Sequence, residues 1–110
     1  MIDRDEILRE FLESISDCTV IVEGKKDAQA LEALGVDPEN IVILNKGQSL
    51  LSTVEALAGD GNVAILTDMD REGKHLYRKL LSMFSQYGIT ENPRPRELFA
   101  QLRISQVEGL

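Results

Sequence analysis

Three short apolar runs constrain the fold of this chain more than any other feature. They are TVIV at residues 19–22, IVIL at residues 41–44, and the apolar start of NVAILTDMD, which begins at Asn62. None of them alternates apolar with polar residues, a pattern typical of strands covered on both faces. A segment with apolar residues at helical spacing follows each run. This alternation predicts an α/β fold in which a parallel sheet has helices on both faces.

The helices are predicted from the same spacing and from their end signals. They cover residues 4–16, residues 25–34, a stretch from residue 48 or 49 to the GDG at residues 59–61, and residues 71–87. Asp3 and Glu6 form a capping-box pattern at the first helix, and Gly35 and Gly88 are expected to end the second and the fourth.

The C-terminal part, residues 90–110, is predicted to be a helical extension. Its prolines suit a helix N-terminus, but Arg94 precedes Pro95, which disfavours helical backbone at residue 94 and leaves the start open. GIT and LRIS are poor candidates for a fourth strand. Arg94, Arg96 and Arg103 form a modest basic cluster, for which a solvated helix face is favoured over contact with nucleic acid. The apolar ending VEGL indicates either a docked short tail or a truncated chain.

Length and composition suit one compact domain in the cytoplasm. The domain divides into an N-terminal helix at residues 1–17, a core at 18–89 and the extension at 90–110 of 110 residues. No apolar run is long enough to span a bilayer, and the charged N-terminus is unlike a signal peptide. A single cysteine and a single histidine argue against a structural zinc site, so any metal should have oxygen ligands. The net charge of −7 counts against tight autonomous binding of nucleic acid, but it permits a local basic site or one where metal ions supply positive charge.

The polar residues after the apolar runs are the candidate site, because doubly wound sheets bind ligands outside the carboxyl ends of their strands. Glu23 follows the first run, and Asp68 and Asp70 follow the third. These carboxylates can share a site only if the first and third strands are neighbours, which predicts the strand order 2-1-3. Like charges that converge need compensation, and carboxylate oxygens suit Mg²⁺ or Mn²⁺.

Each acid also has a simpler interpretation. Asp70 precedes a helix and suits an N-cap, and Glu23 taken alone is typical of a surface acid. Asp27 is either a fourth acid of the site or, slightly favoured, a helix-start acid. Gly73 either allows close backbone approach or merely eases a turn. The order and spacing of the two acidic motifs together favour the metal site.

Basic residues gather at the same strand ends. They are Lys25, Lys46, Arg71 and Lys74, with Gly47 beside them. Cations at a helix N-terminus oppose the helix dipole, so this placement indicates an anion such as a nucleic-acid phosphate. The alternative is that these cations only neutralise neighbouring acids, and that Gly47 ends a strand before a tight turn.

The two motifs, VIVEGKKDAQAL and AILTDMDREGK, resemble those of the Toprim domain, which occurs in topoisomerases, bacterial-type primases and small 5S rRNA maturases. The resemblance covers about residues 19–88 and implies a three-layer, Rossmann-like fold. It also implies Mg²⁺ at Asp68 and Asp70, with Glu23 as a metal ligand or a general acid/base. A topoisomerase needs a nucleophilic tyrosine in a separate domain, and Tyr77 is instead predicted either to pack or to lie at the surface of its helix. A small stand-alone Toprim protein is therefore the best match.

Three functional hypotheses follow. The first is a Mg²⁺-dependent enzyme, with Mn²⁺ as a possible substitute, that cleaves or transfers a phosphodiester in RNA or DNA. The second is a non-catalytic module that binds metal, nucleic acid or a partner protein within a larger assembly. The third is a purely structural acidic domain. Metal binding separates the third hypothesis from the others, and turnover separates the first from the second.

Overall fold

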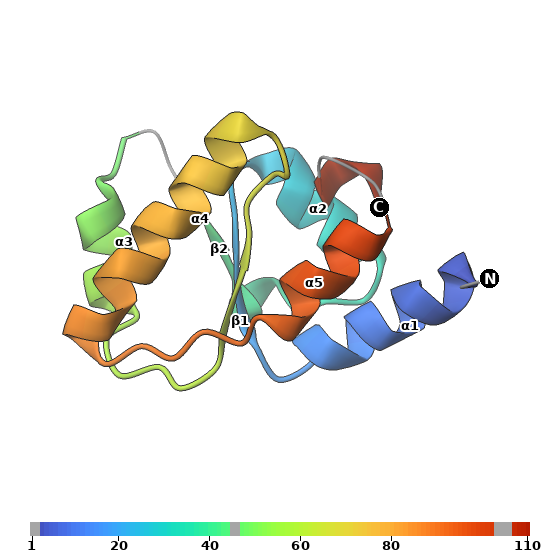
Figure 1. Ribbon diagram of the computed structural model, residues 1–110, viewed down its shortest axis with the longest axis horizontal. Coiled ribbons are helices and arrows are strands. Elements are labelled where there is room, and N and C mark those ends of the chain that lie inside the picture. The colour runs from blue at the N-terminus through green and yellow to red at the C-terminus, as the bar shows by residue number, and fades with distance from the viewer. Residues whose placement is uncertain (1–2, 45–46, 103–106) are drawn as a thin grey trace.

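The structure is a computed structural model that describes residues 3–44, 47–102 and 107–110. Its elements follow the predicted alternation of helix and strand (Figure 1). In chain order they are α1 (Arg4–Ile15), β1 (Thr19–Val22), α2 (Lys25–Ala33), η1 (Pro38–Asn40), β2 (Ile41–Ile43), α3 (Leu50–Ala56), β3 (Val63–Leu66), α4 (Arg71–Phe84), η2 (Ser85–Tyr87), α5 (Arg94–Gln101) and η3 (Val107–Gly109).

The three strands form one parallel sheet in the order β2-β1-β3, which confirms the predicted order. Val22 of β1 lies opposite Ile43 of β2 on one side and Leu66 of β3 on the other. Because β1 is central, the chain crosses from β1 to β2 on one side and then from β2 back past β1 to β3 on the other side. The switch point of the sheet therefore lies between β1 and β3.

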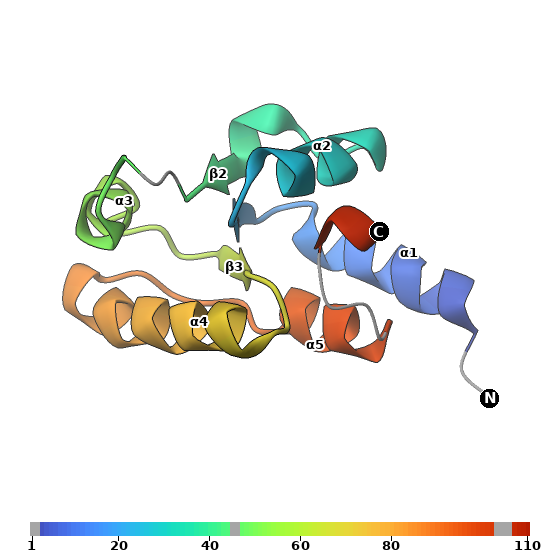
Figure 2. The same ribbon diagram turned by 90° about the horizontal axis from the view of Figure 1, so that it is seen from above.

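Two hydrophobic clusters lie on opposite faces of the sheet. Val20 and Val22 belong to one cluster and Ile21 to the other, as expected for a strand whose side chains alternate between faces. The first cluster includes residues of α1, α2 and α5, and the second includes residues of α3 and α4. Figures 1 and 2 show these two groups of helices on either side of the strands. Strands β1 and β3 are thus covered on both faces, whereas the edge strand β2 is only half-buried and Ile43 is 37% exposed, contrary to the burial that its apolar run predicts.

The helix ends follow local chemistry. The Asp3 side chain caps α1 by accepting a hydrogen bond from the backbone amide of Asp5. The helix predicted over residues 71–87 is α-helical only to Phe84 and tightens into the 3₁₀ turn η2 before Gly88, which adopts a left-handed conformation with φ 65°.

The C-terminal part closes one side of the molecule. Helix α5 packs against α1 and β3, and η3 packs against α2. Val107 is buried in the first cluster, which confirms the docked tail. Beyond β3, the described residues add only an isolated bridge between Val63 and Glu91 to the sheet. Across residues 3–44, 47–102 and 107–110, no helix is long and apolar enough to cross a membrane.

Candidate metal centre

The predicted acids lie where β1 and β3 end side by side. Val22 pairs with Leu66, so Glu23 and Asp68 emerge from neighbouring strands at the same edge of the sheet. One carboxylate oxygen of Glu23, Oε2, accepts a hydrogen bond of 2.7 Å from the backbone amide of Asp68. This contact joins the two acidic motifs although 45 residues separate them in the chain. The structure therefore brings Glu23 and Asp68 together as predicted.

The carboxyl group of Asp68 is poorly compensated. Its Oδ1 atom is buried and has no hydrogen-bond partner among the described residues. Burial, followed by the negative charges of Glu23 and Asp27, raises the pKa of Asp68 to about 6, and the backbone amide of Val107 acts in the opposite direction. A buried oxygen without a partner, surrounded by like charges, fits a cation. Carboxylate oxygens are the ligands that Mg²⁺ and Mn²⁺ prefer.

Asp70 is the N-cap of α4. Its Oδ1 accepts a hydrogen bond of 2.7 Å from the backbone amide of Gly73, which confirms the simpler interpretation of this residue. The cap uses only one carboxylate oxygen of Asp70. Within the described ranges, no three Asp, Glu, His or Cys side chains lie close enough together to hold a metal ion. The predicted convergence of all three acids is therefore not found among the described residues, and Glu23 and Asp68 are the two that the structure joins.

The loop that carries the aspartates packs tightly against the first turn of α4. A Cβ atom added to Gly73 would lie 2.0 Å from the backbone oxygen of Asp68, a distance that no side chain can occupy. The Thr67 hydroxyl donates a hydrogen bond of 2.6 Å to the carbonyl oxygen of Gly73. Of the two interpretations of Gly73, close backbone approach is therefore the correct one.

Asp27 joins the site to the C-terminal tail. Its Oδ2 accepts a hydrogen bond of 3.0 Å from the amide of Gly24 and thereby caps α2, as the favoured interpretation predicted. Its Oδ1 accepts a hydrogen bond of 3.1 Å from the amide of Glu108 in η3. Asp27 also raises the pKa of Asp68, so its charge acts on the site although both of its oxygens have structural partners.

The predicted phosphate-binding cations are exposed and unpaired where the structure describes them. Lys25, Arg71 and Lys74 all have exposed side chains. Both ion pairs found among the described residues involve Arg94, so none of these three cations neutralises a neighbouring acid. Gly47 is exposed and has an interaction partner. Lys46 lies outside the described residues.

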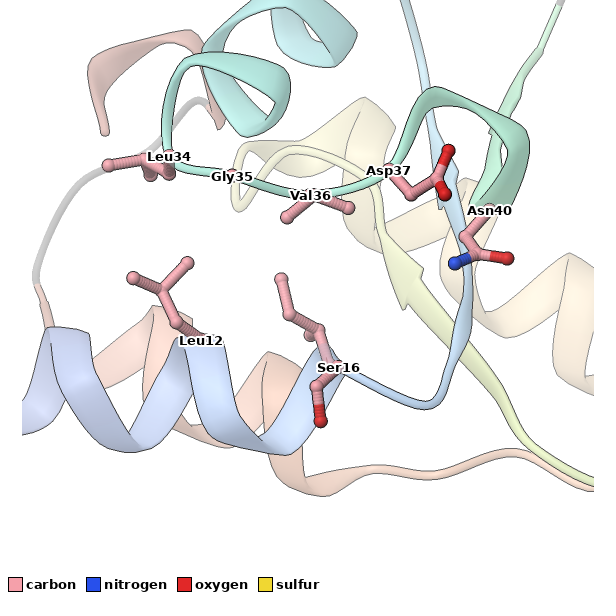
Figure 3. Close-up of a pocket in the computed structure, with 8 residues that line it drawn as sticks. Leu12, Ser16, Leu34, Gly35, Val36, Asp37 and Asn40 are labelled. Atoms are coloured by element: carbon pink, nitrogen blue, oxygen red, sulfur yellow. The ribbon is translucent and has the colours of Figure 1, made fainter.

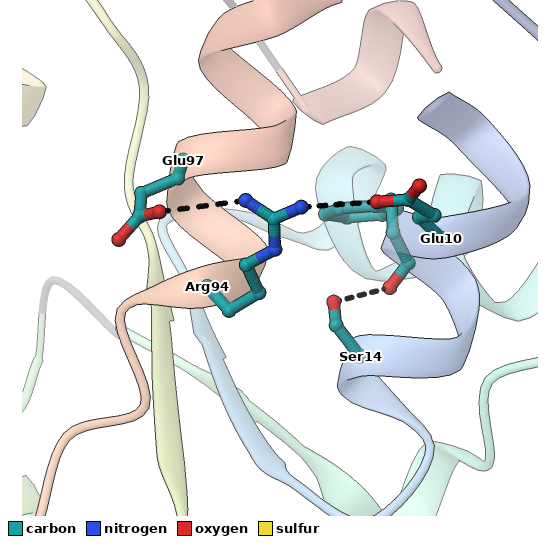
Figure 4. Close-up of polar contacts among 5 residues, drawn as sticks. Glu10, Ser14, Arg94 and Glu97 are labelled. Atoms are coloured by element: carbon teal, nitrogen blue, oxygen red, sulfur yellow. Dashed lines mark hydrogen bonds and ion pairs between the residues drawn. The ribbon is translucent and has the colours of Figure 1, made fainter. Parts of the chain in front are cut away.

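The C-terminal arginines are not one solvated cluster. Arg94 is exposed and forms ion pairs of 3.0 Å with Glu10 of α1 and 3.6 Å with Glu97 (Figure 4). Arg96 is buried at 7% exposure, which contradicts the predicted solvated face. Its guanidinium donates hydrogen bonds to carbonyl groups at the end of β3, on the side where the described residues form no further strand. Arg103 lies outside the described residues.

A hollow of about 380 Å³ lies away from the acids. Figure 3 shows it between Leu12 of α1 and the C-cap Ser16 on one side and the connection from α2 to η1 on the other, where Leu34, Val36 and Asp37 line it. These segments lead into the amino ends of the strands. The hollow therefore lies at the end of the sheet where the strands begin, opposite the end that carries Glu23 and Asp68. It has no part in the candidate site.

The comparisons with known proteins agree with this fold. The sequence model of the Toprim domain matches residues 18–102. A UPF0292 protein of Methanocaldococcus jannaschii is 31% identical over 97% of this chain and 91% of its own length. Another, from Methanosarcina barkeri, is 37% identical over 97% of this chain and 80% of its own length. A solved structure of an Aquifex aeolicus protein superposes with a TM-score of 0.82 over the whole of both chains at 23% identity, which shows the shared fold. The chain belongs to the Toprim family.

Proposed function

We propose that this protein is a Mg²⁺-dependent enzyme that cleaves or transfers a phosphodiester bond in nucleic acid. Glu23, Asp68 and Asp70 would hold the metal, with Mn²⁺ as a substitute. The observation that carries the proposal is the pair of strand ends, where Glu23 contacts the Asp68 backbone and the Asp68 carboxyl group keeps a buried oxygen without a partner among the described residues. Nucleic-acid processing would place the protein in the cytoplasm.

Family membership supports two general parts of this proposal, the binding of a divalent metal ion and a connection with nucleic acids. Toprim domains generally bind divalent metal ions such as Mg²⁺, and the family is connected with nucleic acids. A bound divalent ion supplies positive charge for phosphate oxygens and lowers the pKa of a coordinated water. Glu23 uses one oxygen for the Asp68 amide, which leaves the other to bind the ion or to move a proton.

The outer face of α4 is the surface that best fits the phosphate backbone. This helix contains four of the twelve Lys and Arg residues of the chain and only one of its nineteen acids. Arg71, His75 and Arg78 lie one helical turn apart and, with Glu72, line a shallow hollow of about 480 Å³. Asp70 immediately precedes this face. A strand bound along α4 would therefore reach the acids at one end, with Lys25 and Lys74 as further phosphate contacts.

Cleavage of labelled nucleic acid tests the proposal. Structured RNA and DNA are incubated with the wild-type protein and Mg²⁺ or Mn²⁺, and with Asp68→Ala and Glu23→Gln. We expect cleavage by the wild type and a loss of at least 100-fold in both variants, while Glu13→Gln on the exposed face of α1 serves as the matched control. Absence of wild-type cleavage, or equal cleavage by the site variants, would refute the enzymatic proposal.

The second candidate function is a non-catalytic module, and the conformation of Asp70 favours it. Its carboxylate caps α4, and the described residues contain no assembled group of three ligands. Such a module would bind nucleic acid in a metal-dependent manner without turnover. Gel-shift experiments with and without Mg²⁺, run beside the cleavage assay, separate the two functions.

A further inference from the structure

The outer edge of β3 ends in a set of backbone carbonyls that need donors. Carbonyls of alternate residues in a strand point to the same side, so Val63, Ile65 and Thr67 face outward together. The amide of Asn92 donates a hydrogen bond of 2.8 Å to the carbonyl of Val63. Further along, Arg96 supplies the donors: its Nη1 atom lies 2.7 Å from the Thr67 oxygen and 3.3 Å from the Ile65 oxygen. The guanidinium takes the place of a neighbouring strand.

The same guanidinium extends into the loop that carries the site. Its Nη2 atom donates a hydrogen bond of 3.3 Å to the carbonyl of Asp68, and Nη1 lies 3.2 Å from the Thr67 hydroxyl. That hydroxyl in turn donates to the carbonyl of Gly73 in α4. Arg96 therefore holds the end of β3 directly and the first turn of α4 through Thr67.

The position of Arg96 is itself restrained. Its guanidinium lies over the ring of Tyr77 in α4, 4.4 Å from the ring centroid. Burial and a hydrogen bond to Glu91 raise the pKa of Tyr77 to about 12, so the phenol stays neutral beneath the cation. A guanidinium holds five donors in a fixed planar fork, whereas an ammonium group has three donors on a compact charge and cannot reproduce this fork.

We propose that Arg96 is a positioning residue for the metal centre, an inference that rests on the proposed function. By bridging the carbonyls of Thr67 and Asp68, it sets the direction in which the Asp68 carboxylate faces Glu23. Arg96 contacts neither substrate nor metal and acts through the backbone of the loop. Partners of this kind commonly alter metal affinity 10- to 100-fold when they are removed.

The affinity for Mn²⁺ tests this inference, because geometry and charge predict opposite results. Removal of a cation near an acidic site raises metal affinity if only electrostatics matters. If Arg96 positions the loop, Arg96→Met lowers the Mn²⁺ affinity by about 10- to 100-fold. Arg96→Lys, which keeps the charge but loses the fork of donors, also binds Mn²⁺ less tightly. Arg94→Met, two residues earlier in α5 and exposed, leaves the affinity unchanged.

Titrations of each full-length variant with Mn²⁺, followed by electron paramagnetic resonance, give these affinities, and circular dichroism verifies that each variant is folded. Thr67→Val serves as a second, nearly isosteric variant if Arg96→Met does not fold, and it lowers the affinity several-fold. Unchanged or tighter Mn²⁺ binding in Arg96→Met, or in both Thr67→Val and Arg96→Lys, would overturn the inference.

Hydrogen exchange tests the positioning role of Arg96 independently of the proposed function. If the wild type binds no Mn²⁺, the metal-dependent function fails, but the loop can still be examined. Arg96→Met should then accelerate amide exchange over residues 67–73, and Arg94→Met should not. Equal exchange rates in this segment would overturn the positioning role as well.

Discussion

At the residue scale, the raised pKa of Asp68 makes the stability of the protein depend on pH. Its pKa lies near 6, above the ordinary carboxyl value, so the folded protein holds this proton more tightly than the unfolded chain does. The resulting stabilisation is present at low pH and is lost as the pH rises through about 6. At neutral pH the metal-free protein therefore contains a carboxylate that destabilises it.

Asp68→Asn should accordingly stabilise the metal-free protein at pH 8 and have little effect at pH 5. We expect a gain of about 1 kcal/mol in the free energy of unfolding at pH 8, since partial exposure screens the larger value that the pKa alone would give. Urea denaturation in the presence of a chelator measures it. Asp17→Asn, at an exposed position, is the control, and an Asp68→Asn variant that is less stable than wild type at pH 8 would contradict the argument.

A second prediction at the residue scale concerns the substitution of Gly73. Alanine ordinarily favours a helix over glycine by up to about 1 kcal/mol, but at this position its Cβ would overlap the Asp68 backbone. Gly73→Ala should therefore lower the free energy of unfolding by about 2 kcal/mol or more. Gly61→Ala, where a Cβ meets nothing within 4 Å, should change it by less than about 0.5 kcal/mol. Equal urea midpoints for the two variants would show that the loop can move away from α4.

At the scale of elements, α4 combines a buried face with a basic outer face. Leu80 and Phe84 enter the second hydrophobic cluster, while Lys74 and Arg78 are exposed and, among the described residues, form no ion pair. Cations are concentrated on α4 although the chain as a whole has a net charge of −7. Its outer face is the part of the protein with which a polyanion would make favourable contacts.

The salt dependence of nucleic-acid binding tests this use of α4. Lys74→Ala and Arg78→Ala should each weaken binding and reduce the slope of log affinity against log salt concentration by about 0.7–0.9, the value for one phosphate contact. Fluorescence anisotropy with labelled RNA and DNA across a salt series gives the slope. Arg9→Ala, exposed on α1, should leave the slope unchanged, and slopes that all agree with wild type would remove α4 from the interface.

The elements that could be predicted from the sequence are those with a strong local signal. The runs at residues 19–22 and 63–66 are continuously apolar because both faces of β1 and β3 are buried, and such runs are visible without a structure. The adjacency of the first and third strands, and with it the order 2-1-3, was also predicted, because Glu23 and Asp68 come together only where those two strands are neighbours.

The burial of Arg96 could not be predicted from helical spacing. Its hydrogen bonds are to residues 28 to 31 positions away in the chain, and nothing local distinguishes it from the exposed Arg94. The available signal was indirect: the part of the chain that the structure describes adds no fourth strand beside β3, so the outer carbonyls of β3 need donors from elsewhere. The contact between Asp27 and Glu108 was missed for the same reason, since it depends on where the C-terminal tail packs.

At the scale of the whole molecule, the topology concentrates the acids in a chain that is already acidic. The net charge is −7, and Glu23, Asp27 and Asp68 lie near one another at the carboxyl ends of the strands. Nucleic acid approaching this edge meets like charge unless a divalent ion is present. We therefore expect binding at the site to depend on Mg²⁺ as well as on the α4 cations, in contrast to a basic protein that binds without metal.

Titration of the whole protein with Mn²⁺ shows whether the ends of β1 and β3 bind a divalent ion. We expect saturable binding to the wild type, at least tenfold weaker binding to Glu23→Gln and to Asp68→Asn, and unchanged binding to Glu13→Gln. Isothermal calorimetry gives the affinities and the number of ions bound. Absence of Mn²⁺ binding, or equal affinity in wild type and both site variants, would contradict the assignment of a metal centre to these strand ends.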